Sequence, residues 1–168
     1  MTSNKAEIRL QSAADVPALK RLNEETFGPG RFARTAYRIR EAASPDPRLS
    51  LCAVWNGEII GAVQFTPLTI GEACGALLLG PLIIEKEHAN QGYGLRLMLD
   101  GLRRAAEVGY KLVILVGDLP YYARAGFAVL PPRRIILPGP VDPARLLYAE
   151  LTPQAISLYS GSVKGQQT

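Results

Sequence analysis

The sequence lacks several features that mark common classes of protein. It contains no run of about 18 consecutive apolar residues, so no transmembrane helix is expected. The opening segment MTSNKAEIRL has no apolar stretch of the signal-peptide kind, and we therefore expect a cytoplasmic protein. Cysteine and histidine are scarce, with two and one respectively, and they do not stand at zinc-ligand spacing. No metal site is expected.

These rare side chains also have expected environments. Cys52 and Cys74 both lie in apolar, strand-like runs, so we expect both to be small buried residues. His88 lies in a polar loop, and we expect it to be exposed to solvent rather than catalytic.

A strong excess of charge of either sign is also missing. The 19 lysine and arginine residues exceed the 15 acidic residues by a formal charge of +4. The basic clusters have no interleaved aromatic residues and match no nucleic-acid-binding motif; they are Arg31, Arg34, Arg38 and Arg40, then Arg103 and Arg104, then Arg133 and Arg134. We therefore expect no nucleic-acid partner, because an anionic ligand explains a mild excess equally well.

The length and composition predict one globular domain. With 168 residues, 48% of them hydrophobic, the chain is long enough to bury a substantial core. Residues 6–151 hold the predicted strands and helices, and residues 152–168 read as a C-terminal tail that is polar after Ser160 and expected to fray.

Local signals predict an alternation of strands and helices. Ser12 and Asp15 form a capping-box pattern at the start of a helix that reaches about Phe27, and Asn56-Gly57 predicts a tight hairpin turn. A helix over 92–108 should bury a face made of Leu95, Met98, Leu99, Leu102 and Ala106, with Gly109 as its C-cap. The other predicted elements are strands over 7–11, 49–55, 58–68, 76–84, 112–116 and 146–151, and helices over 31–43 and 121–125.

The most informative segment is 80–94, which reads GPLIIEKEHANQGYG. An apolar strand empties into a polar loop that ends in two glycines, Gly92 and Gly94, where a helix begins. The start of a helix presents free N–H groups to an anion, and glycine lets the backbone approach it, so a pyrophosphate ligand fits. Glycines at such a junction also serve tight packing, and the loop alone leaves both readings open.

Two other phosphate-binding families do not match this loop. A Walker loop needs Lys and Ser or Thr after its last glycine, whereas Leu95 and Arg96 follow here. A dinucleotide fold needs an acidic residue about 20 positions on, where this chain has Lys111 or Leu112.

A second block, Gly117 to Phe127, completes a recognisable pattern. It reads Gly-Asp-x-x-Tyr-Tyr-x-Arg-x-Gly-Phe and follows a strand that is apolar throughout. Together with Gly80-Pro81-Leu82 and the glycine loop, it makes the chain from about Ile8 to Leu151 resemble the GNAT superfamily of acyl-CoA-dependent N-acetyltransferases. The resemblance implies an α/β fold with a mostly antiparallel mixed sheet, helices on both faces, and parallel fourth and fifth strands that splay apart.

The resemblance also implies a chemistry and a set of site residues. Acetyl-CoA, or a related acyl-CoA, would be the donor, and a small-molecule or peptide amine would attack it directly in a ternary complex, without a metal. Tyr122 matches the family tyrosine that protonates the leaving thiolate. The cofactor-binding positions would be Leu82, Ile83 and Ile84 on the fourth strand, Ala89, Asn90, Gln91, Gly92, Tyr93, Gly94 and Leu95 in the loop and helix start, and Tyr122.

The chain departs from the family pattern at several points. Ala89 replaces a usual Gln or Arg, and Gln91 stands where a basic residue is common, so Arg96 or Lys86 would have to supply charge. The fourth strand offers no general base before Glu85 at its end. These departures leave a catalytically weak acyl-CoA-binding or sensor module as the alternative.

Three assignments stay open on the sequence alone. Tyr122 faces the cofactor or anchors the short helix in the core, a packing role that we assign to Tyr121. Phe27, Arg31 and Phe32 either bind the acceptor or form a solvated helix face with core aromatics. A monomer and a homodimer are both compatible with the sequence.

Overall fold

The structure is a computed structural model that describes residues 5–28 and 35–166. One mixed sheet in the order β1-β2-β3-β4-β5-β8-β6 runs through the molecule, and β9 pairs with both β3 and β7. The strands are β1 (Glu7–Leu10), β2 (Leu51–Trp55), β3 (Glu58–Ile70), β4 (Ala73–Ile84), β5 (Leu112–Val116), β6 (Ala128–Val129), β7 (Ile135–Ile136), β8 (Leu146–Glu150) and β9 (Gly161–Gly165). The α-helices are α1 (Val16–Phe27), α2 (Thr35–Glu41), α3 (Tyr93–Val108) and α4 (Leu119–Tyr122).

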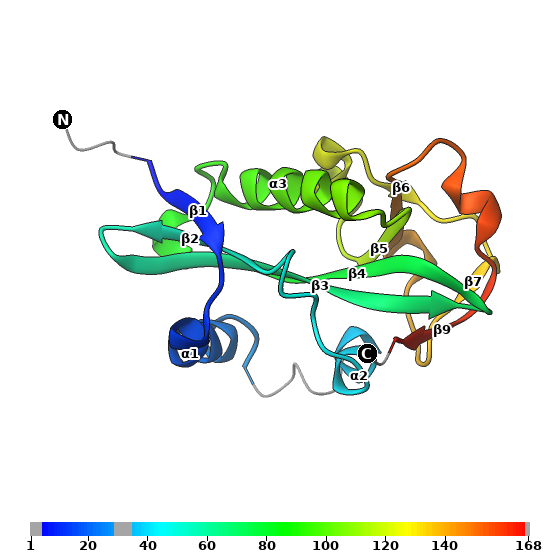
Figure 1. Cartoon of the computed structure of the whole chain (residues 1–168), viewed down its shortest axis with the longest axis horizontal. Coiled ribbons are helices and arrows are strands. Elements are labelled where there is room, and N and C mark those ends of the chain that lie inside the picture. The colour runs from blue at the N-terminus through cyan, green and yellow to red at the C-terminus, as the bar shows by residue number, and fades with distance from the viewer. Residues whose placement is uncertain (1–4, 29–34, 167–168) are drawn as a thin grey trace.

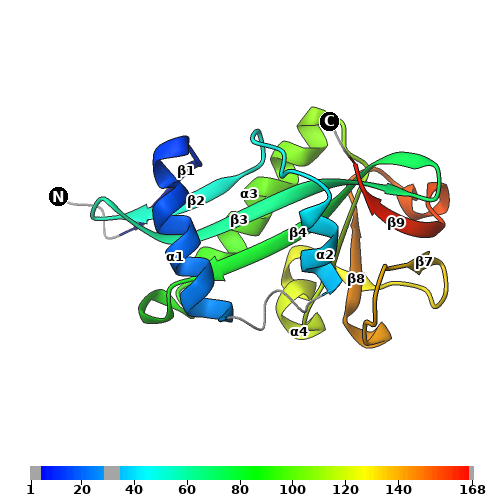
Figure 2. The same cartoon turned by 90° about the horizontal axis from the view of Figure 1, so that it is seen from below.

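The helices lie on both faces of the sheet. Helix α3 covers one face, and α1 and α2 cover the other, as the two views show (Figure 1, Figure 2). Within the sheet β4 and β5 are parallel while β1, β2, β3 and β4 pair antiparallel in succession. The mixed α/β arrangement predicted from the sequence is therefore confirmed.

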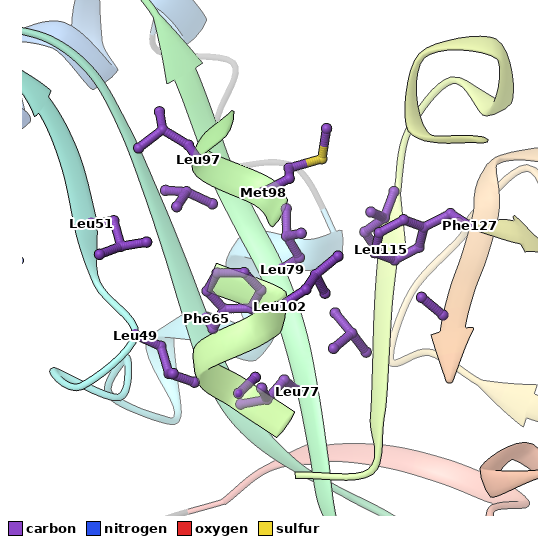
Figure 3. Close-up of a cluster of buried hydrophobic side chains, with 14 of the residues drawn as sticks. Leu49, Leu51, Phe65, Leu77, Leu79, Leu97, Met98, Leu102, Leu115 and Phe127 are labelled. Carbon is purple, nitrogen blue, oxygen red and sulfur yellow. The ribbon is translucent and has the colours of Figure 1, made fainter. Parts of the chain in front are cut away.

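The main core lies between α3 and the sheet. Leu97, Met98 and Leu102 of α3 are buried against Phe65 and Leu77 of the strands (Figure 3). A second buried cluster on the opposite face joins Ile39 of α2 to side chains of β3, β4 and β5 and to Tyr159 and Val163 near the C-terminus. These two clusters fix the strand ends and helix starts that surround the site described below.

Helix α1 is held at its start by local polar contacts. The backbone N–H of Ser12 donates to Asp15 Oδ2 over 2.7 Å, which confirms the predicted capping box. The Arg9 guanidinium on β1 binds both carboxylate oxygens of Asp15 at 2.7 and 2.9 Å, and this hydrogen-bonded pair holds the pKa of Asp15 well below its usual range. The first helix is thereby tied to the edge of the sheet.

Strands β4 and β5 diverge in the middle of the sheet. Their pairing covers only Ala76–Leu78 opposite Leu112–Ile114, although β4 continues to Ile84 and β5 to Val116. On its other side β4 stays paired with β3, with an irregularity in register where Leu79 and Leu82 flank Gly80-Pro81. The predicted splay is confirmed, and it leaves one edge of β4 beyond Leu78 open beside β5.

Helix α3 buries a different face from the one expected from the sequence. Leu99 and Ala106 of α3 are exposed, whereas Gly94 and Gly101 lie on the buried face. Gly101 is buried because the Phe65 ring packs against its α-carbon, where any side chain would collide. The pattern of apolar residues alone therefore predicts a face that is rotated around the helix axis from the face that is buried.

The C-terminal segment is also more ordered than expected. Residues 161–165 form β9, which pairs antiparallel with β3 through Leu68–Ile70 and parallel with β7. Cys52 is fully buried as predicted, but Cys74 is exposed because it lies at the outer end of β4 beside the turn. The expectations of a frayed tail and of a buried Cys74 were wrong.

Candidate active site

A cavity of about 640 Å³ lies where β4 and β5 part. Its floor is the β4 segment Leu79–Leu82, and one wall is formed by residues of α1 and α2. The opposite wall comes from the end of β5 and from α4, including Gly117, Tyr121 and Tyr122. Two segments that the sequence analysis singled out, the Gly80-Pro81-Leu82 strand and the 117–127 block, thus line the same cavity.

Tyr122 has the surroundings of a protonated phenol. Its ring packs against the α-carbon of Gly117, where a side chain would collide, and meets the Phe127 ring edge-on at 6.1 Å between centroids. Burial raises the pKa of Tyr122 to about 12, with smaller contributions from Tyr121 and Asp118. The hydroxyl therefore carries its proton throughout the neutral range.

Tyr121 does not have the core role assigned to it from the sequence. Its side chain is 38% exposed, and its hydroxyl lies against Gly94 in the first turn of α3, where an added Cβ would collide with it. Tyr122, not Tyr121, is the one that packs against the main core, and both tyrosines line the cavity. Consecutive residues of a helix lie about 100° apart around its axis, so Tyr121 and Tyr122 of α4 point in different directions.

The start of α3 is open to a ligand. Gly92 is the N-cap and adopts a left-handed conformation with φ of 86°, which favours glycine. The first intrahelical bond runs from Arg96 N–H to the Gly92 carbonyl, so the N–H groups of Tyr93, Gly94 and Leu95 precede it and point out of the helix end. This geometry is that of an anion-binding helix start.

The other residues predicted to bind the cofactor differ in their exposure to solvent. Ala89, Asn90 and Gln91 are exposed around the turn, with Asn90 at a φ of 62°. Tyr93 is buried in the main core and Leu95 packs against it, so only their backbone groups face the loop. On β4, Ile83 is buried, while Leu82 and Ile84 are partly buried.

Arg96 and Lys86 were the residues expected to supply charge beside the glycine loop. The Arg96 guanidinium turns back to the carbonyl of Ala6 at 3.4 Å and lies 5.9 Å from the Tyr93 ring centroid, away from the helix start. Lys86, the other residue expected to supply charge, is exposed in the short turn that precedes the loop.

Glu85 and His88, which follow β4 in the chain, do not line the cavity. The Glu85 carboxylate lies 3.3 Å from His88 Nδ1, and the His88 ring packs against Trp55 with centroids 5.1 Å apart. His88 is 15% exposed in its side chain, so the expectation of an exposed histidine was wrong. Among the described residues that line the cavity, the carboxylate is that of Asp118, whose Oδ1 lies 3.3 Å from Arg145 Nε.

The acceptor role expected of Phe27, Arg31 and Phe32 stays a prediction. Phe27 lines the cavity, whereas Arg31 and Phe32 lie outside the described residues. Sequence reasoning missed Asn23 of α1, Arg40 of α2 and Gln64 of β3, which also line it. No local motif marks them, because each reaches the cavity through the packing of its element against the sheet.

Comparison with known proteins gives consistent relatives. The profile of the Acetyltransferase (GNAT) family matches residues 16–127. The uncharacterized N-acetyltransferase YhbS of Escherichia coli K12 is 31% identical over 124 residues, which cover 71% of this chain and 72% of that protein. The uncharacterized N-acetyltransferase YjhQ of the same strain is 29% identical over 130 residues, with 76% and 72% covered.

Solved structures show the same arrangement. The crystal structure of Escherichia coli YhbS in complex with CoA superimposes with a TM-score of 0.83 at 25% identity, covering 99% of this chain and 92% of that one. A GNAT family acetyltransferase from Brucella melitensis in complex with acetyl-CoA has a TM-score of 0.72 at 25% identity, covering 98% and 97%. Within residues 5–28 and 35–166, no helix is long and apolar enough to cross a membrane, and no cluster of potential metal ligands occurs.

Proposed function

Because this chain belongs to the GNAT acetyltransferase family, we propose that the cavity between β4 and β5 is its acyl-transfer site and that Tyr122 is the general acid. The protein is an N-acetyltransferase that moves an acetyl group from acyl-CoA to an amine. The assignment rests on one observation. Strand β4 separates from β5 near the start of α3, where the first N–H groups of the helix have no partner within it, and Tyr122 lines the cavity between the two strands.

Acyl-CoA is held by backbone groups in this proposal. The N–H groups from Gln91 to Leu95 bind the pyrophosphate, since glycine at 92 and 94 leaves the helix start bare. The open edge of β4, at Leu82, Ile83 and Ile84, binds the amide-containing arm much as an added strand would. Ala89 and Asn90 shape the loop, and Lys86 in the preceding turn supplies positive charge beside it.

The chemistry follows from the same placement. The acceptor amine attacks the thioester carbonyl, and a backbone N–H of β4 at Leu82 or Ile84 stabilises the oxyanion that develops. When the carbon–sulfur bond breaks, the Tyr122 hydroxyl donates its proton to the leaving thiolate. The amine loses its own proton to water and Tyr122 is reprotonated from solvent, so the balance closes with one acyl group transferred.

No carboxylate of β4 acts as general base in this account. Glu85 is not among the residues that line the cavity, and its carboxylate lies 3.3 Å from His88 Nδ1. The amine therefore enters in its neutral form or passes its proton to a water. A catalytically weak sensor is not favoured, because the relatives are N-acetyltransferases and Tyr122 is in place.

The acceptor is an amine, as in the family, and its size is set by the cavity. A small molecule or the end of a peptide fits about 640 Å³. We place the reaction in the cytoplasm, where acyl-CoA is made, and keep both a monomer and a homodimer as oligomeric states. Release of free thiol from acetyl-CoA across a panel of amines tests the function, and binding of acetyl-CoA without thiol release from any amine would contradict it.

A further inference from the structure

The cavity contains a polar side chain that the proposed reaction does not use. Gln64 of β3 lies between Val63 and Phe65, whose side chains are buried in the main core against α3. Successive side chains of a strand point to opposite faces of the sheet, so Gln64 points to the face that α1 and α2 cover. It is partly buried there, and it lines the cavity between β4 and β5.

The pairing of β3 with β4 places Gln64 beside the proposed thioester position. Its neighbour Val63 is the register partner of Leu82, and the irregularity that follows leaves Gln64 opposite Gly80-Pro81. The backbone N–H of Leu82 is one of the two that we propose to stabilise the oxyanion. The Gln64 side chain therefore leaves β3 next to the segment of β4 where the amine attacks.

A second cavity, of about 340 Å³, meets the first one at this side chain. It lies between α1 and strands β3 and β4, and its lining includes Leu19 of α1 and Ile83 of β4. Asn23, Gln64 and Pro81 line both cavities. An acceptor that extends from one cavity into the other therefore lies against Gln64.

A second glutamine fixes which atom of the Gln64 amide is free to bind a ligand. Gln11, which follows β1, donates from Nε2 to the backbone carbonyls of Leu51 and Val63 at 2.9 and 3.3 Å. Because carbonyl groups only accept, these bonds place the Gln11 nitrogen towards the strands and leave Gln11 Oε1 to accept from Gln64 Nε2, over 3.3 Å. The nitrogen of Gln64 is thereby held by Gln11, and no donor among the described residues binds Gln64 Oε1.

We propose, on the basis of the function proposed above, that Gln64 Oε1 accepts a hydrogen bond from the acceptor amine and turns the nitrogen lone pair towards the thioester carbonyl. As the amine attacks, its nitrogen gains positive charge, and a hydrogen bond from a charged donor is about twice as strong as one from a neutral donor. The bond therefore stabilises the transition state more than the bound amine. Gln11 is a positioning residue, because it acts by holding the Gln64 amide in this orientation.

The test measures thiol release from acetyl-CoA with four amine probes, which are phenethylamine, L-phenylalaninamide, spermidine and hydroxylamine. Gln64→Met keeps the length of the side chain and removes the acceptor oxygen, and it is compared with Gln11→Met and with the double variant. Thr69→Val is the control, because Thr69 also lies on β3 but lines neither cavity. Calorimetric titration with acetyl-CoA checks that each variant is folded and binds the donor.

The expected result is a loss of turnover without a loss of donor binding. Gln64→Met should lower kcat/KM by about tenfold or more, mainly through kcat, for each probe that the wild type acetylates, and it should leave the affinity for acetyl-CoA within about twofold. Gln11→Met should lower kcat/KM by about threefold, because the Gln64 amide can then turn, and it should add no further loss in the double variant. Thr69→Val should match the wild type.

Other outcomes overturn the proposal in distinguishable ways. Unchanged kcat/KM in Gln64→Met, or a loss that is matched by an equal loss of acetyl-CoA affinity, overturns the role of Gln64 and leaves the transferase assignment standing. Losses that add in full in the double variant overturn the positioning role of Gln11. Absence of thiol release with every probe, in a wild-type protein that binds acetyl-CoA, overturns both the role of Gln64 and the proposed function.

Discussion

The Tyr121 hydroxyl lies directly against Gly94, so that a side chain of alanine or larger at position 94 would collide with it. This contact joins the 117–127 block to the first turn of α3, across the gap where β4 and β5 part. It gives a packing reason for a glycine at position 94, beside the approach of a ligand to the start of α3. A ligand that reaches the start of α3 from the cavity passes this point.

Substitution of Gly94 tests the phosphate site. Gly94→Val should weaken acetyl-CoA binding tenfold or more, because the added methyl groups stand in front of the N–H groups that bind the pyrophosphate. The fold should persist, since the Tyr121 side chain is partly exposed and can turn away. Calorimetric titration measures the affinity, and circular dichroism checks the fold.

A second variant protein separates the two reasons for a glycine at position 94, which are ligand approach and packing against Tyr121. In a Tyr121→Ala protein the collision is gone, so Gly94→Val should still weaken binding if the ligand itself needs the space. If Gly94→Val costs affinity only when Tyr121 is present, the glycine serves packing and the phosphate assignment fails.

The role of Glu85 is tested by its amide. Glu85→Gln should lower kcat less than about threefold, because the carboxylate faces His88 rather than the cavity. Tyr122, with a pKa of about 12, stays protonated through the working range. Activity should therefore rise with pH as the acceptor amine deprotonates, and no fall in activity should occur at any pH lower than about 11. A collapse of kcat by orders of magnitude in Glu85→Gln would assign the base to that residue.

A stability prediction concerns Asp46, which ties the loop before β2 to the end of α3. Its carboxylate accepts hydrogen bonds from Arg48 at 2.7 Å and from the Tyr110 hydroxyl at 2.7 Å, and the Arg48 bond is the main reason that the pKa of Asp46 falls to about 2. Asp46→Asn should lower the free energy of unfolding by about 1–3 kcal/mol at pH 7. Urea denaturation measures it.

The direction of the pKa shift of Asp46 fixes how its contribution to stability depends on pH. The folded-state pKa lies below the unfolded value, so the stabilisation is present above about pH 4 and is lost as the pH falls towards 2. The wild type and Asp46→Asn should therefore converge in that window. Asp100→Asn is the matched control, since Asp100 pairs with Arg103 on the surface of α3 and should change stability by no more than about 1 kcal/mol. Equal losses in both variants would remove the special role of Asp46.

Much of the fold could be read from local signals. Asn56 and Gly57 both take a positive φ, 51° and 78°, as the hairpin turn requires. Gly109 closes α3 in a left-handed conformation, and the uninterrupted apolar strand 112–116 is indeed buried and parallel to β4. Each of these features depends on a few neighbouring residues, which is why the sequence alone predicts it.

Features that depend on distant packing were not predictable. The buried face of α3 is set by Gly101 against Phe65, and no hydrophobicity pattern ranks a glycine as buried. Strand β9 is polar and pairs through its backbone, which leaves no periodic side-chain signal. Arg40 reaches the cavity beside Gly80, 40 residues later, where a Cβ would lie 3.1 Å from its Nη1.

The central claim is that Tyr122 donates the proton to the leaving thiolate, and Tyr122→Phe tests it most directly. The ring keeps its packing on Gly117 and Phe127, so the melting temperature should hardly change, while kcat should fall by roughly a hundredfold. Tyr121→Phe is the control, because its hydroxyl lies at Gly94 and should affect acetyl-CoA binding rather than kcat. Measured under conditions where chemistry limits the rate, a silent Tyr122→Phe beside a damaging Tyr121→Phe would move the acid to Tyr121, and full kcat in both variants would contradict tyrosine acid catalysis in this protein.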